Sequence, residues 1–192
     1  MAKRPMIVGV SGVTCGGKTS LCDKLKNLYE GSVIINQDNF FREETDPSHI
    51  WLDVRPGVRH QNWEHLVSID WKAFEAEINR TLNEWKEPEN GLLIIEGHII
   101  FCYDFPFKFD KKYFLTLDKE ECWQRRKVRT YIPNDPEGYF DICIWPMYLQ
   151  NKCLMESMHD NIVYLDGTLP KQLILDEVIK DLQKSEYTNA LQ

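Results

Sequence analysis

The sequence predicts an α/β protein built on a mostly parallel sheet of five strands flanked by helices. Short apolar runs alternate along the chain with segments whose apolar residues recur at helical spacing. The first apolar run leads directly into a glycine-rich loop and then into a helical segment. The chain has 192 residues, 43% of them hydrophobic, which is enough for a proper core. We therefore expect a single domain that spans residues 1–192.

Each of the five expected strands is a short, mainly apolar run followed by a polar residue. Uninterrupted apolar runs suit strands that helices cover on both faces. Right-handed crossovers bring the carboxyl ends of such strands to one edge of the sheet, where the sites of these folds lie. The expected strands are residues 6–10, 32–36, 92–95, 113–117 and 162–165.

Helices are expected where apolar residues recur three and four positions apart. Leu21, Leu25 and Leu28 share one face of the first helix. Asp70 is a candidate N-cap of the second helix, and Asp118 begins a capping box that opens the third. The expected helices are residues 18–29, 67–85, 118–130, 144–159 and 171–182.

Two stretches lack such a pattern. Residues 43–61 are polar and contain two prolines and a glycine, which predicts a long loop of a kind that is usually functional or mobile. The helical pattern also breaks at residues 87–91. Trp71 and Trp85 belong to the apolar stripe of the helix at 67–85, so we favour a core role for them over base stacking.

The most specific short motif lies between the first strand and the first helix, where Gly12 is followed by four residues and then by Gly17, Lys18 and Thr19. Glycines let the backbone turn tightly, and N–H groups at a helix N-terminus bind phosphate oxygens. Lys18 can reach the β- and γ-phosphates, and the Thr19 hydroxyl can ligate Mg²⁺. The sequence therefore predicts a nucleotide-phosphate site formed by Gly12, Val13, Thr14, Cys15, Gly16, Gly17, Lys18, Thr19 and Ser20.

Two carboxylates follow expected strands at the same edge of the sheet. Asp38 can orient or deprotonate an acceptor hydroxyl, or ligate Mg²⁺, and the alternative is a turn aspartate. Glu96 ends the third strand, where an acidic residue near Mg²⁺ is common in proteins with this loop, and glutamate suggests contact through water. The alternative for Glu96 is an ordinary carboxylate at a strand end. We favour the functional interpretation for both residues.

A basic cluster lies on the third expected helix of an otherwise acidic chain. It consists of Arg125, Arg126, Lys127 and Arg129, and the spacing places Arg129 beside both other arginines on the helix surface. Such a cluster suits the charge of a triphosphate. The alternative is a solvated helix face, partly paired with neighbouring glutamates.

The net charge of −7 disfavours nucleic-acid binding. The six cysteines form no C-x-x-C pair, which favours reduced thiols in a cytoplasmic protein. No signal peptide or membrane-spanning run is expected, and thus no membrane partner. We also expect a monomer.

Two residues near the expected site are harder to assign. Cys15 is either a reactive thiol at a helix N-terminus or a tolerated loop residue whose backbone binds phosphate, and we favour the second. His98 has no acid partner or nucleophile at a recognisable spacing, which predicts an ordinary loop histidine. The other four histidines show no metal-binding pattern.

These motifs resemble the nucleoside-type P-loop kinases and, among them, the nicotinamide riboside kinases. The resembling blocks span nearly the whole chain, and the most specific is Gly-Tyr-Phe-Asp-x3-Trp-Pro-Met-Tyr at residues 138–148. The resemblance implies a P-loop kinase fold with a small helical lid at about residues 125–138 and a substrate-binding insertion at about residues 42–70. It also implies ATP- and Mg²⁺-dependent phosphorylation of the ribose 5′-hydroxyl of nicotinamide riboside or nicotinic acid riboside, in NAD biosynthesis.

The same resemblance assigns roles residue by residue. It places Lys18 on the phosphates, Thr19 on Mg²⁺, and Asp38 on the acceptor hydroxyl and near Mg²⁺. The implied ATP contacts outside the loop are Arg125, Arg129, Tyr131, Leu169, Pro170 and Lys171. The implied riboside contacts are Asp38, Asn39, Phe40, Phe41, Trp63, Glu64, Arg126, Tyr131 and Ile132.

One departure leaves the base specificity open. Trp63 and Glu64 stand where this family has tyrosine and aspartate; tryptophan can still stack on a pyridine ring, and glutamate can accept from ribose hydroxyls. Residues 62–65, however, also resemble the corresponding stretch of uridine kinases, so a uridine/cytidine kinase or another small-metabolite kinase is the alternative. A nucleotide-binding switch protein is a more remote one, because a GTPase-type Asn-Lys-x-Asp motif is missing.

Overall fold

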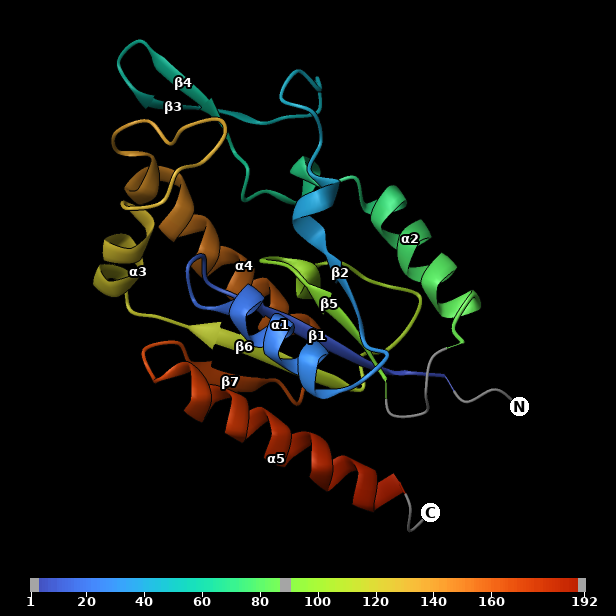
Figure 1. The fold of residues 1–192 in the computed structure, drawn as a ribbon. Helices are drawn as coiled ribbons and strands as arrows, with labels where there is room; N and C mark the ends of the chain where they lie inside the picture. The colour runs from blue at the N-terminus through green and yellow to red at the C-terminus, as the bar shows by residue number, and fades with distance from the viewer. Residues whose placement is uncertain (1–3, 87–90, 190–192) are drawn as a thin grey trace.

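The computed structural model describes residues 4–86 and 91–189. Its central feature is the expected parallel sheet, with the strands in the order β2-β5-β1-β6-β7 (Figure 1). The five-stranded α/β prediction is thus confirmed. The strands are β1 (Met6–Gly12), β2 (Val33–Asn36), β5 (Leu92–Glu96), β6 (Lys111–Thr116) and β7 (Val163–Asp166).

Helices cover both faces of this sheet, and neighbouring residues of one strand serve opposite faces. Val8 and Val10 of β1 pack against α1 (Lys18–Leu28) and α5 (Lys171–Asn189). Ile7 packs on the other side against α2 (Trp71–Asn83) and α4 (Trp145–Met158). Leu21 and Leu25 of α1 are buried, whereas Leu28, where the helix ends, is 56% exposed.

The register of the strands brings their carboxyl ends together. Val10 of β1 and Asn36 of β2 both lie opposite Glu96, the last residue of β5. Gly12 of β1 lies opposite Leu115 of β6. The loops that follow β1, β2 and β5 therefore leave the sheet at one edge, as expected.

The segment expected to be a long loop contains a hairpin, which corrects the prediction for residues 43–61. β3 (Trp51–Arg55) pairs with β4 (Val58–Gln61) in antiparallel fashion, and the hairpin projects away from the main sheet (Figure 1). Pro56 and Gly57 form its two-residue turn, with Gly57 at a φ of 77°. The side chain of Val54 is buried while Asp53 and Arg55 are exposed. This alternation covers only a few residues, and the polar composition of residues 43–61 therefore predicted a loop.

The second helix begins later than its apolar pattern suggests. Asp70 caps α2, its carboxylate accepting a hydrogen bond of 3.0 Å from the Ala73 amide, which confirms the predicted N-cap. Val67 lies before it in a 3₁₀ turn (Leu66–Ser68). Trp71 and Trp85 pack against the core, as expected. The predicted break after this helix lies, apart from Gly91, outside the described residues.

The third helix is shorter than predicted. The carboxylate of Asp118 accepts from the Glu121 amide at 2.8 Å, as the capping box requires, but α3 (Lys119–Arg126) ends four residues before residue 130. The chain then turns, and the Arg129 amide donates to the Arg126 carbonyl at 3.0 Å. The Arg126 guanidinium donates a hydrogen bond of 2.7 Å to the Asp135 carboxylate. Arg129 therefore does not belong to the helix, contrary to the prediction.

A five-residue π-helix (Phe140–Ile144) precedes α4, so the helical segment there begins earlier than predicted. Within the described residues, no helix has the length and apolar character needed to cross a membrane.

Candidate active site

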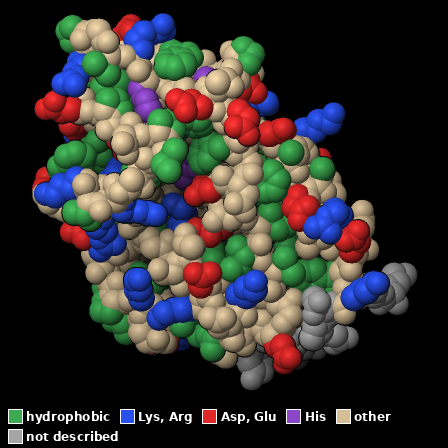
Figure 2. All heavy atoms as spheres, turned by 45° about the horizontal axis from the view of Figure 1, so that its top comes forward, with side chains coloured by type: hydrophobic (Ala, Val, Ile, Leu, Met, Phe, Trp, Pro, Cys, Tyr) green, Lys and Arg blue, Asp and Glu red, His purple; other side chains and the backbone are tan. Residues whose placement is uncertain are grey.

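An open cavity of about 930 Å³ lies at the carboxyl edge of the sheet. Its lining comes from the glycine-rich loop, the turn after β2, the segment after β4, the end of β5, and the region from α3 to residue 135. Figure 2 shows acidic and basic side chains gathered around this hollow. The volume lies within the range of small-molecule sites.

The glycine-rich loop is held in the conformation that anion binding requires. Gly17 caps α1 in a left-handed conformation with a φ of 102°, and Cys15 has a φ of 59°. A Cβ atom at Gly12 would collide with the backbone of Leu115. The Lys18 ammonium donates to the carbonyls of Gly12 and Val13 at 3.1 and 3.0 Å. Amides of the loop and the charge of Lys18 thus stand at one end of the cavity.

Oxygen-bearing side chains meet beside the loop. The Thr19 hydroxyl donates to the Glu96 carboxylate at 2.6 Å, and the Asn36 amide donates to its second oxygen at 3.3 Å. Burial raises the pKa of Glu96, while the bond from Thr19 and the charge of Lys18 oppose the rise. Asp38 lines the same cavity, in a 3₁₀ turn (Gln37–Phe40) that follows β2.

This oxygen set suits Mg²⁺, which is usually bound by one or two carboxylates together with phosphate oxygens and water. The residues concerned are Thr19, Asp38 and Glu96. Throughout residues 4–86 and 91–189, no group of three or more His, Cys, Asp and Glu side chains is placed to hold a metal by itself. A Mg²⁺ ion held by these residues would complete its shell with phosphate oxygens or water.

The predicted arginines lie against the glycine-rich loop, where Arg125 and Arg129 contact Cys15 and Arg126 contacts Thr14. Arg125 donates to the Gly167 carbonyl at 2.9 Å and to the Glu121 carboxylate at 2.6 Å. Arg126 is buried, pairs with Asp135, and donates to the Thr14 hydroxyl at 2.8 Å. All three predicted arginines, Arg125, Arg126 and Arg129, line the cavity even though α3 ends before the last of them.

Cys15 lies within this basic environment. Its sulfur is 3.5 Å from the Tyr131 hydroxyl and 3.7 Å from the Arg129 guanidinium. Burial works to raise the pKa of the thiol, but the hydrogen bonds from Tyr131 and Arg129 outweigh burial, so the pKa lies below its ordinary value. Arg126 stacks over the Tyr131 ring at 4.0 Å.

A second wall of the cavity, which we call the aromatic–acidic wall, consists of Phe41, Trp63, Glu64 and His98. The rings of Phe41 and Trp63 meet edge to face at 5.6 Å, and those of Phe41 and His98 stack at 5.7 Å. Burial raises the pKa of Glu64 to about 7, although the charges of Arg126 and Lys18 oppose the rise. The wall offers an apolar surface with one carboxylate set in it.

His98 is the functional candidate that the sequence analysis set aside. It follows Glu96 and Gly97 at the carboxyl edge, and its Nε2 lies 3.7 Å from a carboxylate oxygen of Glu64. Its acid partner is 34 residues away in the sequence, so no local spacing could reveal the pair. The available signal was its position two residues after a strand-end carboxylate, at the edge where sites collect.

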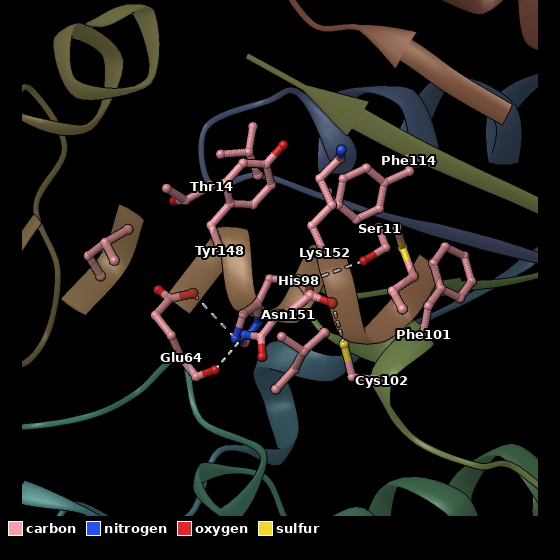
Figure 3. Close-up of a pocket in the computed structure, with 15 residues that line it drawn as sticks. Ser11, Thr14, Glu64, His98, Phe101, Cys102, Phe114, Tyr148, Asn151 and Lys152 are labelled. Carbon is pink, nitrogen blue, oxygen red and sulfur yellow. Dashed lines mark hydrogen bonds and ion pairs between the residues drawn. The ribbon is translucent and has the colours of Figure 1, made fainter. Parts of the chain in front are cut away.

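A small cavity behind the wall shows how it is anchored (Figure 3). The Ser11 hydroxyl donates to the His98 carbonyl at 3.1 Å. The Asn151 side chain of α4 donates to the Glu64 carbonyl at 2.9 Å, and the Cys102 thiol donates to the Asn151 carbonyl at 3.2 Å. The backbone carbonyls of His98 and Glu64 are thereby held by hydrogen bonds from Ser11 and Asn151.

Several predicted contacts lie elsewhere. The Phe40 ring packs 4.9 Å from Phe74 in the core, and Asn39 is exposed and does not line the large cavity. Lys171 lines the cavity and donates to the Ser20 hydroxyl at 3.0 Å. Tyr131 and Ile132 also line the cavity. The predicted residues that do not line it are, besides Asn39 and Phe40, Gly12, Val13, Gly16, Leu169 and Pro170.

Comparison with known proteins adds independent findings. A family model described as an AAA domain matches residues 8–146. Nicotinamide riboside kinase 1 of Rattus norvegicus is 36% identical over 197 residues, which cover 98% of this chain and 100% of that protein. Nicotinamide riboside kinase 2 of Homo sapiens is 32% identical, with coverage of 94% and 82%.

Among solved structures, thymidylate kinase from Candida albicans superposes with a TM-score of 0.58 and covers 97% of this chain and 94% of that one. Its sequence identity of 14% means that the likeness concerns the fold alone.

Proposed function

Because this chain belongs to the nicotinamide riboside kinase family, we propose that it transfers the γ-phosphoryl group of ATP to the ribose 5′-hydroxyl of nicotinamide riboside. Nicotinic acid riboside is a second proposed acceptor, and the products are mononucleotides for NAD synthesis. One observation carries the proposal: the phosphate loop, two strand-end carboxylates and the aromatic–acidic wall line a single cavity.

The loop end of the cavity suits the triphosphate. Loop amides and Lys18 would hold the β- and γ-phosphates, with Arg125 and Arg129, which contact Cys15 of the loop, closing over them. Thr19 and Asp38 would ligate Mg²⁺, and Glu96 would act through a water molecule. When bound, Mg²⁺ neutralises charge on the phosphates.

The acceptor hydroxyl belongs beside Asp38. In the proposed step, the 5′-oxygen forms a bond to the γ-phosphorus while the bond from that phosphorus to the β,γ-bridging oxygen breaks, and ADP leaves. The hydroxyl proton passes to the Asp38 carboxylate and then to solvent. Asp38 is exposed to the cavity, which suits a group that must touch a diffusing substrate.

The aromatic–acidic wall suits a cationic ring. Trp63 offers a face for the pyridinium through a cation–π contact, and the negative charge of ionised Glu64 favours the same cation. Neutral uridine gains neither interaction. A uridine/cytidine kinase is the alternative function, since residues 62–65 also resemble a uridine kinase segment.

The proposal is tested by incubating the protein with Mg-ATP and nicotinamide riboside, nicotinic acid riboside, uridine or cytidine. Mass spectrometry identifies each monophosphate, and initial rates give kcat/KM. We expect nicotinamide riboside to be used far better than uridine. A clear preference for uridine contradicts the proposal, and nucleotide binding without any transfer would favour a regulatory protein instead.

A further inference from the structure

We propose that two buried hydroxyl groups, those of Tyr139 and Ser68, fix the backbone of Trp63 and thereby set how its ring faces the riboside. Tyr139 is 1% exposed and Ser68 is fully buried, and neither lines the large cavity, so both act on a ligand only through a neighbour. The inference rests on the proposed riboside kinase function and deepens it, because it names positioning residues on which recognition of the acceptor depends.

The Tyr139 hydroxyl joins the end of the hairpin to the aromatic–acidic wall. It donates to the Gln61 carbonyl at 2.6 Å and accepts from the Trp63 amide at 3.2 Å. Gln61 is the last residue of β4, so the Trp63 amide lies beyond the ladder that pairs β3 with β4. A side chain 76 residues away in the sequence therefore supplies the acceptor that this amide needs.

The carbonyl of Trp63 is held from the other end of the same turn. The Ser68 hydroxyl shares its proton between the Trp63 carbonyl at 2.9 Å and the His65 carbonyl at 2.7 Å. The amide and the carbonyl of Trp63 are thus both bonded by side-chain hydroxyls of buried residues. The position of this backbone segment then depends on two oxygen atoms, each of which a conservative substitution can remove.

The contacts of the Trp63 ring are less directional than these hydrogen bonds. The ring meets Phe41 edge to face at 5.6 Å and His49 edge to face at 4.5 Å, and it packs against the apolar cluster that contains Val54. Apolar contacts of this kind tolerate small shifts, whereas hydrogen bonds weaken steeply with angle. A cation–π contact requires the ligand over the ring face, so a shift of the Trp63 backbone should weaken riboside binding.

Tyr139 is itself held firmly enough to position another residue. Its ring packs edge to face on His60 at 4.6 Å and belongs to the same apolar cluster as Val54. Its amide donates to the Pro136 carbonyl at 3.0 Å. Burial raises the pKa of Tyr139, so the hydroxyl keeps the proton that it donates to Gln61. A functional side chain keeps its geometry only when the residues behind it are locked in this way.

The test is a pair of double-mutant cycles, Tyr139→Phe with Trp63→Ala and Ser68→Ala with Trp63→Ala. Tyr139→Phe and Ser68→Ala each remove one oxygen atom, and Tyr139→Phe keeps the buried ring. For each protein, kcat and KM are measured for nicotinamide riboside and for ATP, and melting temperatures check folding. If the two hydroxyls act through Trp63, their removal should matter only while Trp63 is present.

The matched control is Tyr113→Phe. Tyr113 is also fully buried, and its hydroxyl donates to the Asp181 carboxylate at 2.9 Å. It packs in the core with residues of α1 and α5 and does not line the cavity. Tyr113→Phe therefore reports what the loss of a buried tyrosine hydroxyl does to this protein away from the site.

We expect Tyr139→Phe and Ser68→Ala each to raise KM for nicotinamide riboside by roughly 3- to 10-fold, while kcat and the KM for ATP stay near the wild-type values. In the Trp63→Ala background, the same substitutions should change that KM by less than about twofold. Tyr113→Phe should behave as the wild type in all three measurements.

An equal rise in KM in both backgrounds overturns the inference, because the hydroxyls would then act independently of Trp63. An unchanged KM for the riboside in either folded variant also overturns it, as does a matching rise in Tyr113→Phe, which would trace the effect to lost stability. If Tyr139→Phe does not fold, the Ser68→Ala cycle decides. Failure of the wild type to phosphorylate the riboside at all contradicts the proposed function instead.

Discussion

Replacing Glu64 with Gln should remove a pH dependence that acts in opposite directions on activity and on stability. Burial raises the pKa of this carboxyl to about 7. The groups that face it are Arg126 and Lys18, which lower the pKa, Asp135 and Asp38, which raise it, and the ring of His98, which burial keeps neutral by lowering its pKa. The proposed contact with a cationic ring requires the ionised form.

Activity should therefore increase with pH. With a pKa of about 7, the ionised fraction of Glu64 in the free protein rises roughly tenfold between pH 6 and pH 8. We expect kcat/KM for nicotinamide riboside to rise by about the same factor at saturating Mg-ATP. Glu64→Gln should have a low, nearly flat profile. Glu43→Gln is the matched control, because Glu43 lines the same cavity but is exposed, and it should keep the wild-type profile.

Stability should change in the opposite direction. Glu64 has a folded-state pKa above its unfolded value of 4.5, so its contribution to stability is fully present below pH 4.5 and is lost as pH rises through about 7. Raising the pKa from 4.5 to about 7 corresponds to about 3 kcal/mol in total, of which about 2–3 kcal/mol falls between pH 5 and pH 8. His98 is present in both proteins, so its own titration largely cancels in the comparison with Glu64→Gln.

Urea unfolding of wild type and Glu64→Gln at pH 5 and pH 8 measures that difference. Relative to the wild type, Glu64→Gln should gain stability as pH rises. If the two proteins keep a constant difference in the free energy of unfolding, and Glu64→Gln retains the wild-type activity profile, the reasoning about a buried carboxyl that must ionise is refuted.

Three further substitutions test the proposed roles. Lys18→Ala should reduce kcat by roughly 30- to 1,000-fold, from the loss of about 2–4 kcal/mol of transition-state stabilisation, and wild-type turnover in the purified, folded variant would contradict the phosphate-loop assignment. Asp38→Asn should lower kcat by roughly 10²- to 10⁴-fold with a smaller effect on ATP binding, measured by calorimetry; a kcat within a few-fold of wild type would make Asp38 structural. Trp63→Ala should raise KM for nicotinamide riboside by roughly 2- to 30-fold while the KM for ATP changes less, and an equal effect with uridine would argue against a cation–π contact.

The sequence predicted those features that depend on residues close together in the chain. The five strands were recognisable because a doubly covered strand must be apolar throughout. The phosphate loop was recognisable because its glycines and Lys18 are needed in a fixed order within a few residues. Asp70 and Asp118 were predicted as caps because a helix N-terminus needs an acceptor at a set position.

The predictions that were wrong concern features that depend on contacts between distant segments of the chain. The helix expected through residue 130 ends at Arg126, whose guanidinium pairs with Asp135 and bonds Thr14 of the phosphate loop. The intrinsic helix preferences of residues 127–130 do not reveal these contacts, so they could not predict where the helix ends. The hairpin formed by β3 and β4 was likewise hidden in a polar stretch, because only a few residues face inward.

His98 shows most clearly why a site cannot be completed from sequence alone. Its chemistry depends on a carboxylate that reaches it from the segment after β4, on Phe41 from the turn after β2, and on an anchor at Ser11 in β1. Each neighbour is ordinary in its own local context. The parallel sheet delivers the ends of β1, β2 and β5 to one edge, and this arrangement brings Ser11, Phe41 and Glu64 into contact with His98. A histidine that directly follows a strand end at such an edge therefore merits a functional hypothesis even when no motif surrounds it.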